Sequence, residues 1–162
     1  MNKYLRGLVV IPCRTIKMLW TKLFHVSCFN GPVLCQVSPY TEITMDKGAK
    51  FSIGKDFKMR DGAKIRIRKN ATCIVGSNTA ISSNNIITCR KYISIGNNYQ
   101  LSPNVLIYDH DFCAEGGIWE GKYKESPIEI GDNCVVGAGC VLNGEYPEGS
   151  VIIQQRETEV LR

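Results

Sequence analysis

The stretch IGNNYQLSPNVLI, residues 95–107, decides the fold of this chain, because its apolar residues recur six apart. Ile95, Leu101 and Ile107 mark the hexads, and Gly96 follows the first of them. A period of six is neither the 3.6 of a helix nor the 2 of a simple strand. It is typical of short strands joined by tight corners, in which every sixth side chain points into a stacked interior.

The same spacing recurs in three other segments, each of which begins with an apolar–glycine pair. The sets are Ile53, Met59 and Ile65; Val75, Ile81 and Ile87; and Ile130, Val136 and Leu142. Three hexads make one triangular turn, so the repeats predict an all-β solenoid with each turn stacked on the last. The glycine is expected to relieve the bend at each corner.

The intervals between the sets locate one long insertion. The first two intervals are 22 and 20 residues, close to a turn of three hexads, but the third is 35. The excess follows Ile107, so we expect a loop over residues 108–127 to leave the solenoid there. Long loops on rigid scaffolds usually carry function.

The expected loop contains His110, one of two histidines in the chain, between Asp109 and Asp111. Neutral imidazole has a pKa near neutral pH, and an adjacent carboxylate fixes its tautomer and stabilises the imidazolium. His110 is therefore a candidate general base, with Asp109, Asp111 or a backbone carbonyl as its orienting partner. Taken alone the triplet also fits a solvated loop; the surrounding repeat favours catalysis.

Positive charge is concentrated at the N-terminal end. Residues 1–41 contain five lysines and arginines and no acidic residue, whereas the rest of the chain carries fifteen of each sign. The net charge of +5 is thus confined to one end. This distribution predicts contact with an anionic surface such as lipid headgroups, rather than with nucleic acid.

Residues 1–30 are expected to form a basic amphipathic helical segment before the solenoid. Its apolar stripe at helical spacing consists of Ile16, Leu19, Trp20, Leu23 and Phe24. Such stripes most often pack on the main domain, and we expect that arrangement here. The alternative is a helix that rests on a membrane surface.

The eight cysteines form no C-x-x-C pair and no zinc-finger spacing. The apolar run at 8–11 is too short for an export signal or a membrane span, so we expect reduced thiols in a cytoplasmic protein. Cys134 and Cys140 occupy the fifth place of their hexads, as do Ala63 and Thr79. A small inward side chain fits that place, so both cysteines are expected to pack inside.

The repeat with a histidine-bearing loop resembles the hexapeptide-repeat acyltransferases, most closely the bacterial capsule and lipopolysaccharide O-acetyltransferases and the related maltose and galactoside acetyltransferases. The likeness runs from about Val37 to the C-terminus, through ISIGNNYQLSPNVLIYDHDF, GKYKESPIEIGDNC and VVGAGCVLNGEYPEGSVIIQQRETEVLR. It implies a left-handed parallel β-helix over residues 37–153, a tail over 154–162, and a homotrimer with active sites between subunits.

The resemblance also implies the chemistry. Such enzymes transfer an acetyl group from acetyl-CoA to a hydroxyl or an amine, and the loop histidine, here His110, takes the proton of the acceptor. The hydroxyl then attacks the thioester directly, without an acyl-enzyme or a metal. By this likeness we expect an O-acetyltransferase for a surface-polysaccharide sugar or its precursor, cytoplasmic or peripheral at the inner face of the membrane.

The remaining site residues are carried over from the resemblance. The expected contacts of the sugar or glycan acceptor are Ser82, Asn84, Asn85, Trp119 and Tyr123. The expected contacts of acetyl-CoA are Gly137, Ala138 and Gly139, along which the pantetheine arm would run, and Arg156 at its phosphates. Structural alternatives stay open: asparagine caps left-handed corners, tryptophan anchors loops, and Gly–Ala–Gly is also an ordinary corner.

Two departures from the family pattern keep other functions open. Ser82 stands where the maltose and galactoside relatives have asparagine, and about one turn that relatives carry after IGDNC is absent here. The alternatives are an N-acetyltransferase for an amino-sugar nucleotide and a catalytically weakened scaffold subunit. A zinc hydratase of this fold needs three histidine ligands, and the chain has only His25 and His110.

Overall fold

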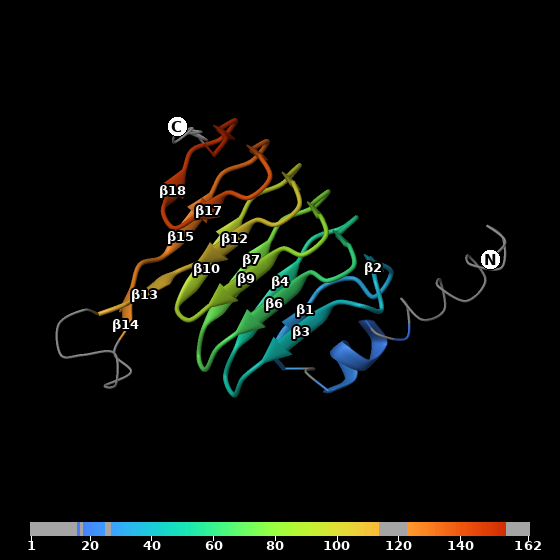
Figure 1. Cartoon of the computed structure of the whole chain (residues 1–162). Helices are drawn as coiled ribbons and strands as arrows, with labels where there is room; N and C mark the ends of the chain where they lie inside the picture. Colours follow the sequence, from blue (N-terminus) through green and yellow to red (C-terminus); the bar gives the residue numbers. More distant parts are fainter. Residues whose placement is uncertain (1–15, 17, 25–26, 114–122, 155–162) are drawn as a thin grey trace, which may run out of the picture.

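The structure is a computed structural model that describes residues 16, 18–24, 27–113 and 123–154. The chain forms an all-β parallel solenoid with one short helix beside its first turn (Figure 1). The predicted fold class, a parallel β-helix built of hexapeptide repeats, is confirmed.

Three parallel sheets form the faces of the solenoid, because successive turns contribute one strand to each. The first sheet consists of β1 (Phe29–Asn30), β4 (Lys50–Ile53), β7 (Thr72–Val75), β10 (Tyr92–Ile95), β15 (Ile128–Ile130) and β18 (Glu145–Tyr146). The second consists of β2 (Gln36–Val37), β5 (Lys58–Met59), β8 (Ala80–Ile81), β11 (Gln100–Leu101), β16 (Val135–Val136) and β19 (Val151–Ile152). The third consists of β3 (Glu42–Met45), β6 (Lys64–Ile67), β9 (Ile86–Cys89), β12 (Leu106–Tyr108) and β17 (Val141–Leu142).

The hexad residues stack as their spacing predicts. In the first sheet Ile53 pairs with Val75, Val75 with Ile95, and Ile95 with Ile130. The other two sheets show the same pairing of hexad residues from turn to turn. Intervals of 22, 20 and 35 residues therefore each correspond to one turn, and the hexad side chains form a continuous buried core.

The glycine after each first hexad residue has a different role from the one predicted. A Cβ atom on Gly76 would lie 2.5 Å from the carbonyl oxygen of Gly96 in the next turn. Gly76 does not have a positive φ, so it admits the close approach of the stacked backbone rather than a bend. Non-glycine residues supply left-handed corners at Asp56, Asn70, Asn78, Asn84, Asn98, Asn104 and Asn133.

The prediction for the inward cysteines is confirmed. Cys134 and Cys140 are buried, as are Ala63 and Thr79 at the same place of their hexads. The seven cysteines that lie in the described part of the chain are free thiols.

The stacking register continues beyond the hairpin insertion, through β15 and the strands that follow it. β15 pairs with β18, and Ile130 and Tyr146 lie opposite each other although only 16 residues separate them. β16 pairs with β11 on one side and with β19 on the other. The solenoid therefore continues without a break to β19.

The helix packs on the solenoid by the face opposite to the one predicted. Residues 16 and 18–24 are helical, and Met18 is fully buried in the core of the solenoid. The predicted stripe faces away instead: Leu19 is 51%, Leu23 70% and Phe24 67% exposed. The expectation that this stripe packs on the domain is therefore wrong. Over the described residues, no helix has the length and apolar character needed to cross a bilayer.

Candidate functional site

The insertion after β12 leaves and rejoins the solenoid as a hairpin. β13 (His110–Phe112) pairs antiparallel with β14 (Tyr123–Glu125), so that His110 lies opposite Glu125. Residues 114–122 between these strands, among them Trp119, lie outside the described residues. The hairpin places His110 at the corner where the chain passes from the third sheet to the first.

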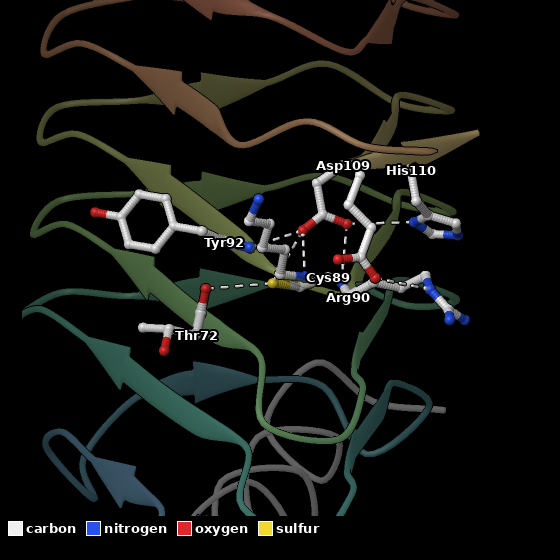
Figure 2. Close-up of polar contacts among 8 residues, drawn as sticks. Thr72, Cys89, Arg90, Tyr92, Asp109 and His110 are labelled. Carbon is white, nitrogen blue, oxygen red and sulfur yellow. Dashed lines mark hydrogen bonds and ion pairs between the residues drawn. The ribbon is translucent and has the colours of Figure 1, made fainter. Parts of the chain in front are cut away.

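Asp109 directs its side chain into the solenoid, where it is fully buried (Figure 2). Three backbone amides of the preceding turn donate to its carboxylate: Arg90 N to Oδ1 at 2.8 Å, and Lys91 N and Tyr92 N to Oδ2 at 2.7 and 2.8 Å. An unpaired buried carboxylate would be very costly, whereas such a group of convergent amides stabilises the charged form.

The same carboxylate orients His110. Asp109 Oδ1 lies 3.2 Å from His110 Nδ1, and the imidazole is 16% exposed (Figure 2). A carboxylate only accepts hydrogen bonds, so Nδ1 carries the proton in this geometry and Nε2 is left to accept one. Asp111 is exposed on the hairpin, where its backbone pairs with Lys124. Of the two predicted aspartates, Asp109 is therefore the one that contacts the imidazole.

Two tyrosines and an arginine surround the imidazole. The rings of Tyr108 and Tyr123 meet that of His110 edge to face, with centroid distances of 6.1 and 5.4 Å. The Arg90 guanidinium lies 3.8 Å from the centroid of the Tyr123 ring, and its Nε lies 3.6 Å from Glu125 Oε1. These contacts attach the hairpin to the corner that supplies the amides for Asp109.

Arg90, Tyr108 and Glu125 are not among the residues that the sequence predicts for the site. A signal for Arg90 does exist in the sequence, because β9 and β12 pair with an offset of 20 residues, and the same offset relates Arg90 to His110. No comparable signal points to Glu125, whose position depends on how the hairpin pairs.

Two buried thiols lie beneath Asp109. Cys89 Sγ donates to the carbonyl oxygen of Thr72 at 3.2 Å and lies 3.7 Å from Asp109 Oδ2. Burial, and then the neighbouring Cys73 and Asp109, raise the pKa of Cys89. Burial and Asp109 raise the pKa of Cys73 to about 12. Both groups are therefore neutral thiols at physiological pH, which suits packing and not nucleophilic chemistry.

Three of the predicted acceptor residues, Ser82, Asn84 and Asn85, lie at another corner, whereas Tyr123 lies beside His110. Asn84 is exposed in a left-handed conformation with φ of 60°, between β8 and β9. Asn85 is buried, and its Oδ1 accepts a hydrogen bond from Val105 N at 2.7 Å. Asn85 therefore supports the solenoid rather than facing an acceptor. Ser82 is half-buried, and the next residue, Ser83, lines a polar hollow of about 330 Å³.

The predicted coenzyme corner stacks above the acceptor corner. Gly139, with φ of 75°, lies between β16 and β17 and donates its N–H to Pro103 O at 3.2 Å. Asn104 N in turn donates to Ser83 O at 3.1 Å. Gly137 and the exposed Ala138 belong to the same corner, whereas Arg156 lies outside the described residues.

Within one chain the predicted residues thus form two groups. His110, Asp109 and Tyr123 meet beyond the C-terminal ends of the strands of the third sheet. The corners that carry Asn84 and Gly139 stack before the N-terminal ends of these strands. A strand rises about 3.3 Å per residue, so roughly 15–20 Å of sheet separates the groups.

No protein-family model matches this chain, and no curated protein matches it. The architecture nevertheless defines its class as a parallel β-solenoid of hexapeptide repeats. In the described part of the chain, no group of three or more histidine, cysteine and acidic side chains is arranged to hold a metal ion.

Proposed function

We propose that this protein is an acetyl-CoA-dependent O-acetyltransferase that acts on a sugar hydroxyl of a surface polysaccharide or its precursor. The observation that carries the proposal is the contact between the buried, amide-held Asp109 carboxylate and His110 Nδ1 at 3.2 Å. A histidine oriented in this way by a carboxylate is the arrangement expected of a general base.

In the proposed reaction, His110 Nε2 takes the proton of the acceptor hydroxyl while the hydroxyl oxygen attacks the thioester carbonyl. The new C–O bond forms, the C–S bond breaks, and the departing CoA thiolate receives the proton from the imidazolium. The Asp109 carboxylate stabilises the imidazolium in between. General base catalysis of this kind contributes about 10²–10⁴ in rate.

The proposal includes a homotrimer with composite active sites. The corners that carry Asn84 and Gly139 lie too far from His110 to act with it in one chain, so a second copy would supply them. Three solenoids packed side by side would bring the stacked corners that carry Asn84 and Gly139 in one copy toward His110 of the next copy.

The test incubates the purified full chain with acetyl-CoA and a panel of sugars and amino-sugar nucleotides. Free CoA is measured by chromatography, because half-buried cysteines such as Cys28 and Cys113 would react with thiol reagents. We expect His110→Ala to lower CoA release by about 10²–10⁴, and His25→Ala, which changes the other histidine, to leave it unchanged.

Release that is equal in wild type and His110→Ala would overturn the proposal. Acetylation of the amino-sugar nucleotides alone would favour the N-acetyltransferase alternative. A trimer that binds no acetyl-CoA would favour the scaffold, because the shortened turn lies where relatives are expected to hold the coenzyme.

A further inference from the structure

The outer face of the N-terminal helix is an exposed apolar surface. Its side chains are Ile16, Leu19, Trp20, Leu23 and Phe24, and each is at least 50% exposed. Trp20 and Phe24 stack on each other with ring centroids 5.0 Å apart. Five large apolar side chains on one short helix are far more than the scattered single residues of an ordinary surface.

Helical geometry explains why this face points outward. With about 100° of rotation per residue, the five side chains fall on one side of the helix and Met18 on the other. Met18 belongs to the core of the solenoid. The helix therefore contacts the first turn of the solenoid through Met18, and its apolar stripe faces away from that turn. Lys22 is exposed at the boundary, where its Nζ lies 3.3 Å from Gly31 O.

An apolar outer face is unusual in this position. Terminal caps of solenoids normally carry a polar outer face, because it keeps the end of the stack soluble. Here Leu19, Trp20, Leu23 and the stem of Lys22 instead line an apolar hollow of about 320 Å³. The outer face of the helix therefore has the character of a surface that contacts another molecule or a membrane.

We propose that this helix face docks on an anionic lipid bilayer. The charge of the surrounding chain selects this partner: residues 1–41 carry five basic residues and no acidic one. A bilayer with anionic headgroups complements both the apolar stripe and the positive charge. Two copies that paired through this face would instead bring two positively charged segments together.

The proposed orientation lays the helix in the interface plane and directs the solenoid axis away from the lipid. β12 lies three strands above β3 in the third sheet. With strands about 4.8 Å apart, His110 would stand on the order of 15 Å above the first turn. The docking surface itself does not depend on the acetyltransferase proposal.

The experiment measures co-sedimentation of the full chain with vesicles of phosphatidylcholine, alone or mixed with phosphatidylglycerol. We expect binding to the anionic vesicles that weakens as salt is added, because exposed charges are screened. The double variant Leu19→Ser/Leu23→Ser should lower the partition coefficient about tenfold or more, because two apolar contacts with lipid are lost.

Leu34→Ser/Ile153→Ser is the matched control, because these side chains are 82% and 72% exposed and do not belong to the helix. It should bind like the wild type, and circular dichroism should show both double variants folded. No binding to anionic vesicles, or equal binding by the two double variants, would overturn the proposal. A smaller oligomer in Leu19→Ser/Leu23→Ser without vesicle binding would overturn it too, in favour of an interface between copies.

Discussion

Asp109 links the candidate base to the backbone of the solenoid. Its carboxylate accepts three amides from the turn below and contacts His110 Nδ1 on its outer side. Alternation along the strand explains this orientation: Ile107 points inward, Tyr108 outward and Asp109 inward again. The same alternation turns His110 away from the interior of the solenoid.

We expect Asp109→Asn to lower both stability and activity. An amide has one acceptor oxygen and an NH₂ group that would face the backbone N–H donors, so the free energy of unfolding should fall by about 2–4 kcal/mol. The imidazole would also lose the carboxylate that fixes its tautomer, and kcat should fall about a hundredfold or more while KM changes little. Urea denaturation and steady-state kinetics measure the two effects.

Asp111→Asn is the comparison for this variant, because its carboxylate is exposed on the hairpin. Asp111→Asn should change neither the free energy of unfolding nor kcat appreciably. A larger loss of kcat in Asp111→Asn than in Asp109→Asn would contradict the assignment of the orienting aspartate.

Among the elements, the β13–β14 hairpin is held on the solenoid by side-chain contacts that meet at Arg90 and Tyr123. Arg90 stacks on Tyr123 and pairs with Glu125, and Tyr123 packs against the imidazole. Arg90 also provides one of the amides that hold Asp109. The corner after β9 therefore positions both the base and its orienting carboxylate.

We expect Arg90→Met to loosen the hairpin without unfolding the solenoid. Methionine keeps an unbranched side chain but removes the cation–π contact and the ion pair, while the backbone amide remains. Hydrogen exchange should become faster at residues 110–113 and 123–125, and kcat should fall about tenfold because the imidazole is held less firmly.

Lys91→Met serves as the control, because the exposed Lys91 contributes only its backbone amide to Asp109. Unchanged exchange in the hairpin of Arg90→Met would show that other contacts hold it, and would remove Arg90 from the site.

At the scale of the whole molecule, stacking supplies rigidity. Asparagine side chains at the corners bond from turn to turn, with Asn78 Nδ2 to Asn98 Oδ1 and Asn98 Nδ2 to Asn133 Oδ1 both at 3.1 Å. Each turn contacts only its neighbours, so these ladders and the hexad core hold the turns in register. The interior is therefore closed to solvent between the ends.

This enclosure predicts which thiols react. Among the cysteines of residues 27–113 and 123–154, iodoacetamide at pH 8 should modify the half-buried Cys28 and Cys113 first and leave Cys73 and Cys89 unmodified until the solenoid unfolds. An unfolded Cys73 ionises near its ordinary pKa of 9.0, whereas the folded one holds its proton to about 12. The free energy of unfolding should therefore fall as the pH rises above 9.

Peptide mass spectrometry after timed alkylation measures this order, and urea denaturation at several pH values measures the slope. Modification of Cys73 as fast as Cys28 in the native protein would contradict a closed interior.

The hexad spacing is enough to predict the solenoid. A period of six states which side chains point inward, and the stacking of Ile53, Val75, Ile95 and Ile130 follows from it, because equivalent apolar residues bury most area when one lies on the next. The excess of residues after Ile107 also locates the loop that contains His110. The sequence shows that Asp109 and Asp111 flank this histidine.

The surroundings of His110 and the direction in which the helix faces depend on contacts between distant segments of the chain. Arg90 and Glu125 are 35 residues apart and meet through the pairing of a hairpin with a corner, which no local pattern encodes. The amphipathic stripe of the helix was visible in the sequence, but a stripe states which side chains share a face and not what that face contacts. Met18, a single residue on the opposite side, fitted the end of the core and so turned the stripe outward.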